Sequence, residues 1–316
     1  MTQHQMRRIA RVVSVLVATV LLGTAIWKLD IGSVTLALTS VRPGWIVASI
    51  AVSVLILPLW ALQWMILAPP GAGNRLRPMV GVVAISSAMH NTAVAFVGEG
   101  VGVAGLVTRI GLEPAAAFSV LAMDQLLVGL AKLALVAVAA RLLPLPAGMV
   151  SAATIVAVGA TVLLAATLAL AFVHEPVARV FSGRAAQFIS RFGQALAPLR
   201  SPRRFSAALV LAGAKLAADL AAIVCVQRAF GVDLPVASAV LALVILGFAT
   251  ALPVAPANLG TYEASIVVAY TAFGIPAEQA LGMALVQHAC RLVALAAPGY
   301  GWLLAVAASS KATASR

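Results

Sequence analysis

The sequence predicts an all-α polytopic membrane protein with about six full spans and two broken, re-entrant helical hairpins. Hydrophobic residues make up 63% of the 316 residues and charged residues only 9%, and the mean hydropathy is +1.07. Soluble domains are far less apolar, with roughly a quarter of their residues charged. The alternating ten-residue pattern of membrane strands is absent from the sequence. Runs near the ~20 apolar residues that a helix needs to cross a bilayer recur along the chain.

Six apolar stretches have the composition of full spans. They cover about residues 12–27, 44–68, 114–140, 148–173, 205–227 and 276–305. Arg7, Arg8 and Arg11 precede the first stretch, and most other basic loop residues fall on the side that this start assigns to the cytoplasm. The positive-inside rule therefore places both termini in the cytoplasm. It also explains most of the net charge of +12 without a nucleic-acid partner.

The longest polar stretch, residues 174–204, is strongly basic. Its apolar residues fall on one helical face; they are Val177, Phe181, Phe188, Phe192, Leu196 and Leu199. A helix lying at the cytoplasmic membrane interface is favoured over a plain basic loop. We expect its arginines to attract anionic lipid headgroups.

An interrupted apolar segment over residues 79–111 contains His90, Asn91 and Glu99, where a span would be uniformly apolar. If it held a full span and a second one, the second would have only about ten residues, half of what crossing needs. We therefore expect a hairpin that enters from the cytoplasm and returns there.

A second interrupted element covers residues 236–274. Pro253 and Pro256 break a helix because proline has no backbone N–H, and Gly260 permits a sharp turn. The apolar run that follows is about ten residues long, too short to cross. Such broken elements survive at membrane depth when protein covers them or when they line a polar cavity.

The two interrupted elements resemble each other. Each has a glutamate, a short apolar run, a glycine and then a proline that begins a long helix; the glutamates are Glu99 and Glu263. The predicted topology makes the halves, residues 1–147 and 148–316, opposite in orientation. Inverted repeats whose broken helices meet near the midplane are typical of transporters.

The glycines around Glu99 contain two short motifs. Gly100, Gly102 and Gly105 match G-x-G-x-x-G, but no βαβ unit surrounds them, which argues against a nucleotide site. Gly98 and Gly102 match G-x-x-x-G, which indicates close helix contact. Zinc-binding, P-loop and hydrolase motifs are absent from the sequence, so it predicts no catalytic residue, metal or cofactor.

The second element and the last span resemble the lysylphosphatidylglycerol synthase transmembrane (flippase-like) family. Its C-terminal signature is matched by Pro253, Pro256, Gly260, Glu263 and Gly274, with Arg291 in the last helix, and its N-terminal signature by Asn91, Gly98 and Glu99. The Glu-Arg pair common in the family's next helix appears here as Asp124-Gln125. The resemblance covers about residues 10–305.

This resemblance implies a flippase or transporter in a bacterial cytoplasmic membrane that moves an anionic or polar-headed lipid, such as a phospholipid, a polyprenyl phosphate or a hopanoid. We expect the chain to lack the soluble transferase domain of the synthases, so an enzyme is not favoured. The alternatives are an intramembrane transferase acting on a lipid-linked substrate and a non-catalytic membrane subunit. The lipid, the coupling and the oligomeric state are left open.

Ionisable groups at membrane depth cost roughly 2.5–3.5 kcal/mol each, so they face protein or water. In one interpretation, Arg291 and the helix N-termini after Gly260 and Gly98 hold a lipid phosphate, while Glu263 and Glu99 pair, gate or bind a proton. In the alternative, Arg291 and Glu263 form a structural bridge. Lys215 and Asp219, at i and i+4, suit a structural pair. The full set of candidate translocation residues is Glu263, Arg291, Glu99, Asn91, Asp124, His288, Gly260, Pro256, Tyr262 and Gly98.

His288 lies three residues before Arg291, nearly on the same helix face. It can relay protons, or it can be a hydrogen-bonded packing residue.

Overall fold

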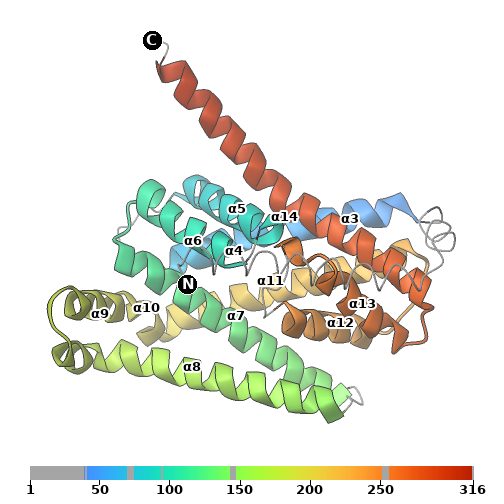
Figure 1. Cartoon of the computed structure of the whole chain (residues 1–316), viewed down its shortest axis with the longest axis horizontal. Helices are drawn as coiled ribbons and strands as arrows, with labels where there is room; N and C mark the ends of the chain where they lie inside the picture. The colour runs from blue at the N-terminus through green and yellow to red at the C-terminus, as the bar shows by residue number, and fades with distance from the viewer. Residues whose placement is uncertain are drawn as a thin grey trace, which may run out of the picture. The chain divides into compact units, whose positions relative to one another are not determined.

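The structure is a computed structural model that describes residues 39, 41–69, 75–93, 95–142, 147–250 and 256–314. Every regular element in this part of the chain is helical, as the composition predicts (Figure 1). The predicted span 12–27 and the helix-breaking Pro253 lie outside the described residues.

Among the described residues, four helical stretches are long and apolar enough to cross a membrane: Pro43–Leu67, Pro114–Val138, Pro202–Ala229 and Ala277–Val306. They coincide with the predicted spans 44–68, 114–140, 205–227 and 276–305. The first consists of α3 (Pro43–Val54) and α4 (Ile56–Leu67); the others lie in α7 (Pro114–Leu142), α11 (Pro202–Ala229) and α14 (Ala277–Ala314). Three begin with proline, whose fixed φ suits a first helical position.

The predicted span 148–173 lies in α8 (Ala147–Val180), which bends where the prediction ends it. Val173 has φ −117° and ψ 22°, three residues before Pro176. Proline removes a helical hydrogen bond and clashes with the preceding turn, which explains the bend.

The basic segment is helical, as predicted, but it is not one helix: it is divided among the end of α8, α9 (Gly183–Ala195), α10 (Ala197–Arg200) and the start of α11. Phe188 of α9 packs edge-on against Phe118 of α7 and stacks on Phe192, and the Ser119 hydroxyl donates to the Phe192 carbonyl at 2.9 Å. The apolar face of α9 is thus partly used for packing on α7, and its basic face includes the exposed Arg191.

The first interrupted element is a helical hairpin of α5 (Leu76–Thr92) and α6 (Ala95–Gly105), followed by a π-helical turn (Leu106–Ile110). A Cβ on Gly98 would lie 2.6 Å from backbone atoms of His90, one on Gly102 would lie 2.9 Å from Ser86, and one on Gly105 would meet Val82 at 2.6 Å. These contacts run in opposite chain directions, so the helices are antiparallel and touch through glycine. The G-x-x-x-G prediction of close helix contact is confirmed.

The second interrupted element contains α12 (Val236–Ala249), a 3₁₀ turn (Pro256–Asn258) and α13 (Thr261–Thr271). With 14 and 11 residues, α12 and α13 are ~21 Å and ~17 Å long at ~1.5 Å per residue, short of the ~30 Å hydrocarbon core. In Figure 1, α12, α13 and α14 lie together. The predicted short helix after Gly260 is confirmed.

The chain divides into two compact units. The first comprises Met1–Val54, Ser87–Gly98 and Ala218–Arg316, and the second Leu55–Ser86 and Glu99–Ala217. Each unit contains residues from both of the predicted halves, 1–147 and 148–316. The inverted symmetry of those halves stays a prediction.

Candidate functional site

In the first unit, the breaks of the two hairpins meet. The Ala257 N–H of the second hairpin donates to the Ala93 carbonyl of the first at 2.9 Å. Ala257 and the next residue, Asn258, have φ of 54° and 53°, in the left-handed region that non-glycine residues rarely adopt. Such strain concentrates at functional sites and persists only where the surroundings impose it. The unit in which the tips meet is therefore the candidate location of the functional site.

The carboxylate of Glu263 is held on both sides at the start of α13. Gly260, with φ of 79°, begins the helix, and its N–H donates to Glu263 Oε2 at 2.7 Å. The other oxygen, Oε1, lies 2.7 Å from His288 Nδ1 of α14, and the His288 ring stacks on Tyr262 with ring centroids 4.2 Å apart. All three side chains are buried. Glu263 is thus a buried, fixed group that joins α13 to α14.

Gln287 of α14 extends this polar network. Its Nε2 donates to the Tyr262 hydroxyl at 3.0 Å, and its Oε1 accepts from the Tyr270 hydroxyl at 3.1 Å. Each of these buried polar groups therefore has a partner, as stability at membrane depth requires.

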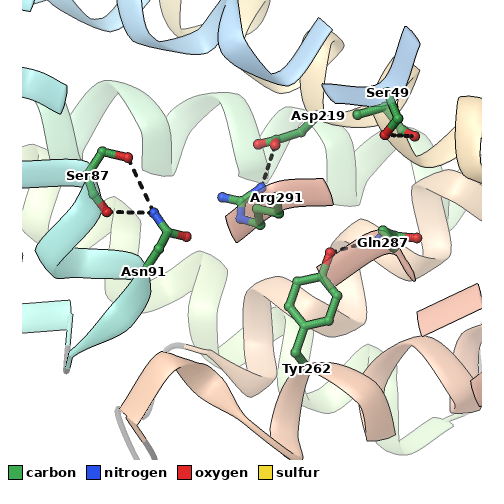
Figure 2. Close-up of polar contacts among 8 residues, drawn as sticks. Ser49, Ser87, Asn91, Asp219, Tyr262, Gln287 and Arg291 are labelled. Carbon is green, nitrogen blue, oxygen red and sulfur yellow. Dashed lines mark hydrogen bonds and ion pairs between the residues drawn. The ribbon is translucent and has the colours of Figure 1, made fainter. Parts of the chain in front are cut away.

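Beside this network lies an ion pair that is only partly covered. Arg291 Nη1 lies 2.6 Å from Asp219 Oδ1 of α11, and their side chains are 31% and 20% exposed. Both line a small cavity of about 20 Å³, whose polar wall also includes Ser49, Ser53, Tyr262 and Gln287. This is room for about one water molecule. Figure 2 shows Arg291 between Asp219 and the Tyr262–Gln287 pair.

Asn91 comes from the end of α5, next to the first tip. Its Nδ2 donates to the Ser87 carbonyl at 2.8 Å and to the Ser87 hydroxyl at 3.3 Å (Figure 2). The following residue, Thr92, shares a 2.6 Å hydrogen bond with the Tyr300 hydroxyl of α14. The end of α5 is therefore tied to the same long helix that holds Arg291.

A family comparison decides what this fold belongs to. The model of the lysylphosphatidylglycerol synthase TM region matches residues 11–299, most of the chain. The chain belongs to this family. None of the curated proteins matches it significantly. As a member of the lysylphosphatidylglycerol synthase TM-region family, it is a membrane protein related to lipid modification or transport.

Two predicted ion pairs in this family member are wrong. Arg291 pairs with Asp219, and Glu263 pairs with His288. His288 and Arg291 are three positions apart on α14, so their side chains differ in direction by about 60° around the helix axis, enough to direct them at different helices. Lys215 does not pair with Asp219, because each finds a counter-ion on another helix.

Of the two helix N-termini predicted to hold phosphate, the one after Gly260 is present and the one after Gly98 is not. Gly98 lies inside α6, which begins at Ala95, and it packs against His90. The Gly260 N–H is bound by the Glu263 carboxylate of the same helix. The backbone of Pro256 lies in the 3₁₀ turn at the second tip. The described geometry thus leaves Arg291 as the cationic group at the cavity.

The second unit contains the remaining predicted residues of this family member. Asp124 is buried; its Oδ1 lies 3.0 Å from Lys215 Nζ, and its Oδ2 accepts from Trp60 Nε1 at 2.7 Å. Lys215 Nζ also lies 5.2 Å from the Trp60 ring centroid. Glu99 accepts an exposed 3.3 Å hydrogen bond from Gln125 Nε2. Asp124 is thus buried with both carboxylate oxygens engaged, as expected of a residue that holds helices together.

The prediction overlooked several cavity residues and misassigned another. Ser49, Ser53 and Gln287 were not singled out, and Asp219 was assigned to a structural pair. Gln287 carries a signal in the sequence, because with His288 and Arg291 it forms a polar face on an otherwise apolar helix. Serines at membrane depth carry none, because they bond their own helix readily.

Proposed function

We propose that this protein moves a lipid with an anionic or polar headgroup across the membrane, and that Arg291 binds the headgroup. The observation that supports this most is the partly exposed Arg291–Asp219 pair in a polar cavity of the unit in which the two hairpin tips meet. A guanidinium at membrane depth must keep an anionic or polar partner. It also holds phosphate or carboxylate through a planar fork of donors.

Asp219 acts in this proposal as the resident counter-ion of Arg291. A lipid phosphate that enters the cavity takes the place of the Asp219 carboxylate on the guanidinium, and Asp219 reclaims it when the lipid leaves. The cavity of about 20 Å³ holds no headgroup as it stands, so entry requires the surrounding helices to separate. The described conformation is then the occluded one.

The hairpins supply the alternating access in this proposal. Broken helices that meet from opposite sides near the midplane are the usual plan of transporters, and the Ala257–Ala93 hydrogen bond is a tip-to-tip contact of this kind. We propose that both hairpins are re-entrant and that the two halves form an inverted repeat. Two contacts support the underlying topology, because each joins helix ends assigned to one side. They are Arg204 Nη2 to the Ala68 carbonyl, and Arg42 N–H to the Ala229 carbonyl.

We propose translocation rather than covalent chemistry, in a bacterial cytoplasmic membrane with both termini inside. Glu263 supports this, because both of its carboxylate oxygens are engaged in buried contacts that fix helices. A general base needs a carboxylate that can reach a substrate proton.

The test is headgroup accessibility in proteoliposomes, with fluorescent lipids and a membrane-impermeant quencher. We expect the wild type to equilibrate an anionic lipid between leaflets, Arg291→Ala to slow it at least tenfold, and Arg291→Lys to retain part of the rate. Arg228→Gln is the matched control, since Arg228 pairs with Asp233 at an exposed position. A folded Arg291→Ala protein with the wild-type rate would refute the proposal. New products in the extracted lipids would favour the transferase instead.

Asp219→Asn tests the counter-ion role separately. It keeps the shape and a hydrogen-bond acceptor but removes the charge that competes with a lipid anion. We expect anionic lipid to bind more tightly and to leave more slowly, so that turnover falls at saturating lipid. Weaker binding of anionic lipid would contradict the exchange of counter-ions.

A further inference from the structure

A second feature of the molecule, in the second unit, is an open groove where the end of α4 meets the start of α11. It has a volume of about 610 Å³ and is lined by Leu62, Met65, Ile66, Arg203, Arg204 and Ala207. This volume falls within the ~300–1,000 Å³ of small-ligand sites. The groove shares no residue with the cavity around Arg291.

The groove is divided by chemistry along its length. Leu62, Met65 and Ile66 form an apolar wall from the last turns of α4, and Ala207 forms part of the α11 side. Arg203 and Arg204 stand at the first turn of α11, and none of the six lining residues is acidic. An apolar trough that ends in two guanidinium groups matches a molecule with a hydrocarbon part and an anionic end.

The position of the groove matches the depth of a lipid headgroup. Both helices that form it are candidate spans, and the groove uses the last residues of one and the first residues of the other. From Leu62 to the end of α4 is five residues, or ~7.5 Å at ~1.5 Å per residue. This length accommodates a glycerol backbone and the upper part of acyl chains, with the phosphate at the arginines.

The two arginines differ in their freedom. Arg204 is half-buried, and its Nη2 donates to the Ala68 carbonyl just after α4 at 3.1 Å, which fixes the guanidinium at the groove. Arg203 is exposed. A fixed arginine beside an exposed one can clamp a phosphate with several charge-assisted hydrogen bonds.

We propose that this groove is a binding site for one anionic glycerophospholipid of the adjoining leaflet, whose phosphate contacts Arg203 and Arg204 and whose acyl chains lie along Leu62, Met65 and Ile66. The site is separate from the Arg291 cavity and does not depend on whether the protein transports lipid. It localises the lipid attraction of the basic segment to two of its arginines.

The test is native mass spectrometry of the purified full-length protein, titrated with phosphatidylglycerol or with phosphatidylcholine of the same acyl chains. We expect one tightly bound phosphatidylglycerol and weaker phosphatidylcholine. Arg203→Gln should weaken phosphatidylglycerol about fivefold, from ~1 kcal/mol per basic residue near an anionic lipid. Arg179→Gln is the matched control, because Arg179 is an exposed arginine of the same basic segment outside the groove.

Filling the groove tests its shape without changing its charge. We expect Ala207→Trp, and independently Leu62→Trp, to abolish the bound phosphatidylglycerol in protein that remains monodisperse. Equal weakening by Arg203→Gln and Arg179→Gln would reduce the effect to diffuse charge attraction and overturn the proposal. Equal affinity for the two lipids, or unchanged binding in both filled variants, would also overturn it. Loss of transport in Arg291→Ala bears only on the other site.

Discussion

The buried pair of Asp124 and Lys215 offers a strong test of what holds the second unit together. Their side chains are 2% and 9% exposed, their charged atoms lie 3.0 Å apart, and Asp124 also accepts from Trp60. Removing one partner of a buried pair leaves an uncompensated charge, which costs ~3–5 kcal/mol. Asp124→Asn keeps an acceptor for Trp60, so it measures the loss of charge alone. We expect it to destabilise the protein by that amount.

A double variant separates the cost of an unpaired charge from the cost of changing the two side chains. Asp124→Asn with Lys215→Met removes both charges, and replacing a buried pair by neutral groups is often neutral or stabilising. The double variant should therefore be more stable than either single variant by at least ~2 kcal/mol. Arg228 and Asp233, 46% and 78% exposed, form the control pair. Their coupling should be only ~0.2–1 kcal/mol.

The assay is reversible unfolding in mixed micelles, followed by tryptophan fluorescence and circular dichroism, with leaflet exchange measured on the same variants. A double variant whose free energy of unfolding is no higher than that of the less stable single variant would refute the ion-pair reasoning. A stable double variant that has lost leaflet exchange would return Asp124 to the translocation pathway, where the sequence placed it. We expect it to keep exchange, because Asp124 is sealed from the surface.

Two further predictions concern the hairpins, and both are measured by the same unfolding assay. Gly98→Ala places a Cβ 2.6 Å from the backbone of His90, which cannot move aside, and we expect a loss of ~1–3 kcal/mol; Gly100→Ala, which meets open space, should be neutral or stabilising. Ala257→Gly relieves a φ of 54° and should stabilise by up to ~1 kcal/mol, whereas Ala264→Gly inside α13 should cost ~1 kcal/mol. Equal effects within either pair of variants would contradict the packing or the strain on which that prediction rests.

Positions of helices followed from the sequence because apolar length and proline act locally. The predicted span 114–140 and the helix Pro114–Leu142 agree within two residues, since proline fixes the start. The break before Gly260 could likewise be predicted from the sequence, because glycine permits a sharp turn. In the structure Gly260 has a positive φ and precedes the short α13.

The partners in the ion pairs could not be predicted from the sequence, because pairing depends on which helices are neighbours. Asp124 and Lys215 are 91 residues apart, and nothing local in the sequence brings them together. To predict the partner of Glu263, one must know which face of α14 is directed at α13. That face carries His288, whereas Arg291, three positions later, is directed at Asp219 of α11. The contact between Ala93 and Ala257 uses backbone atoms only, so the residue types at these positions do not predict it.

The energetics of that tip contact bear on whether the hairpins can separate. A backbone hydrogen bond contributes a net ~0.5–1.5 kcal/mol, and a left-handed alanine costs ~1–2 kcal/mol. When the Ala257–Ala93 bond breaks, Ala257 is free to leave its strained φ, so the two terms nearly cancel. A contact of this kind fixes the geometry of the closed tips and still allows them to part at little cost. Ala257→Gly removes the strain but keeps the bond, so a transporter that works by parting the tips should become more stable and slower together.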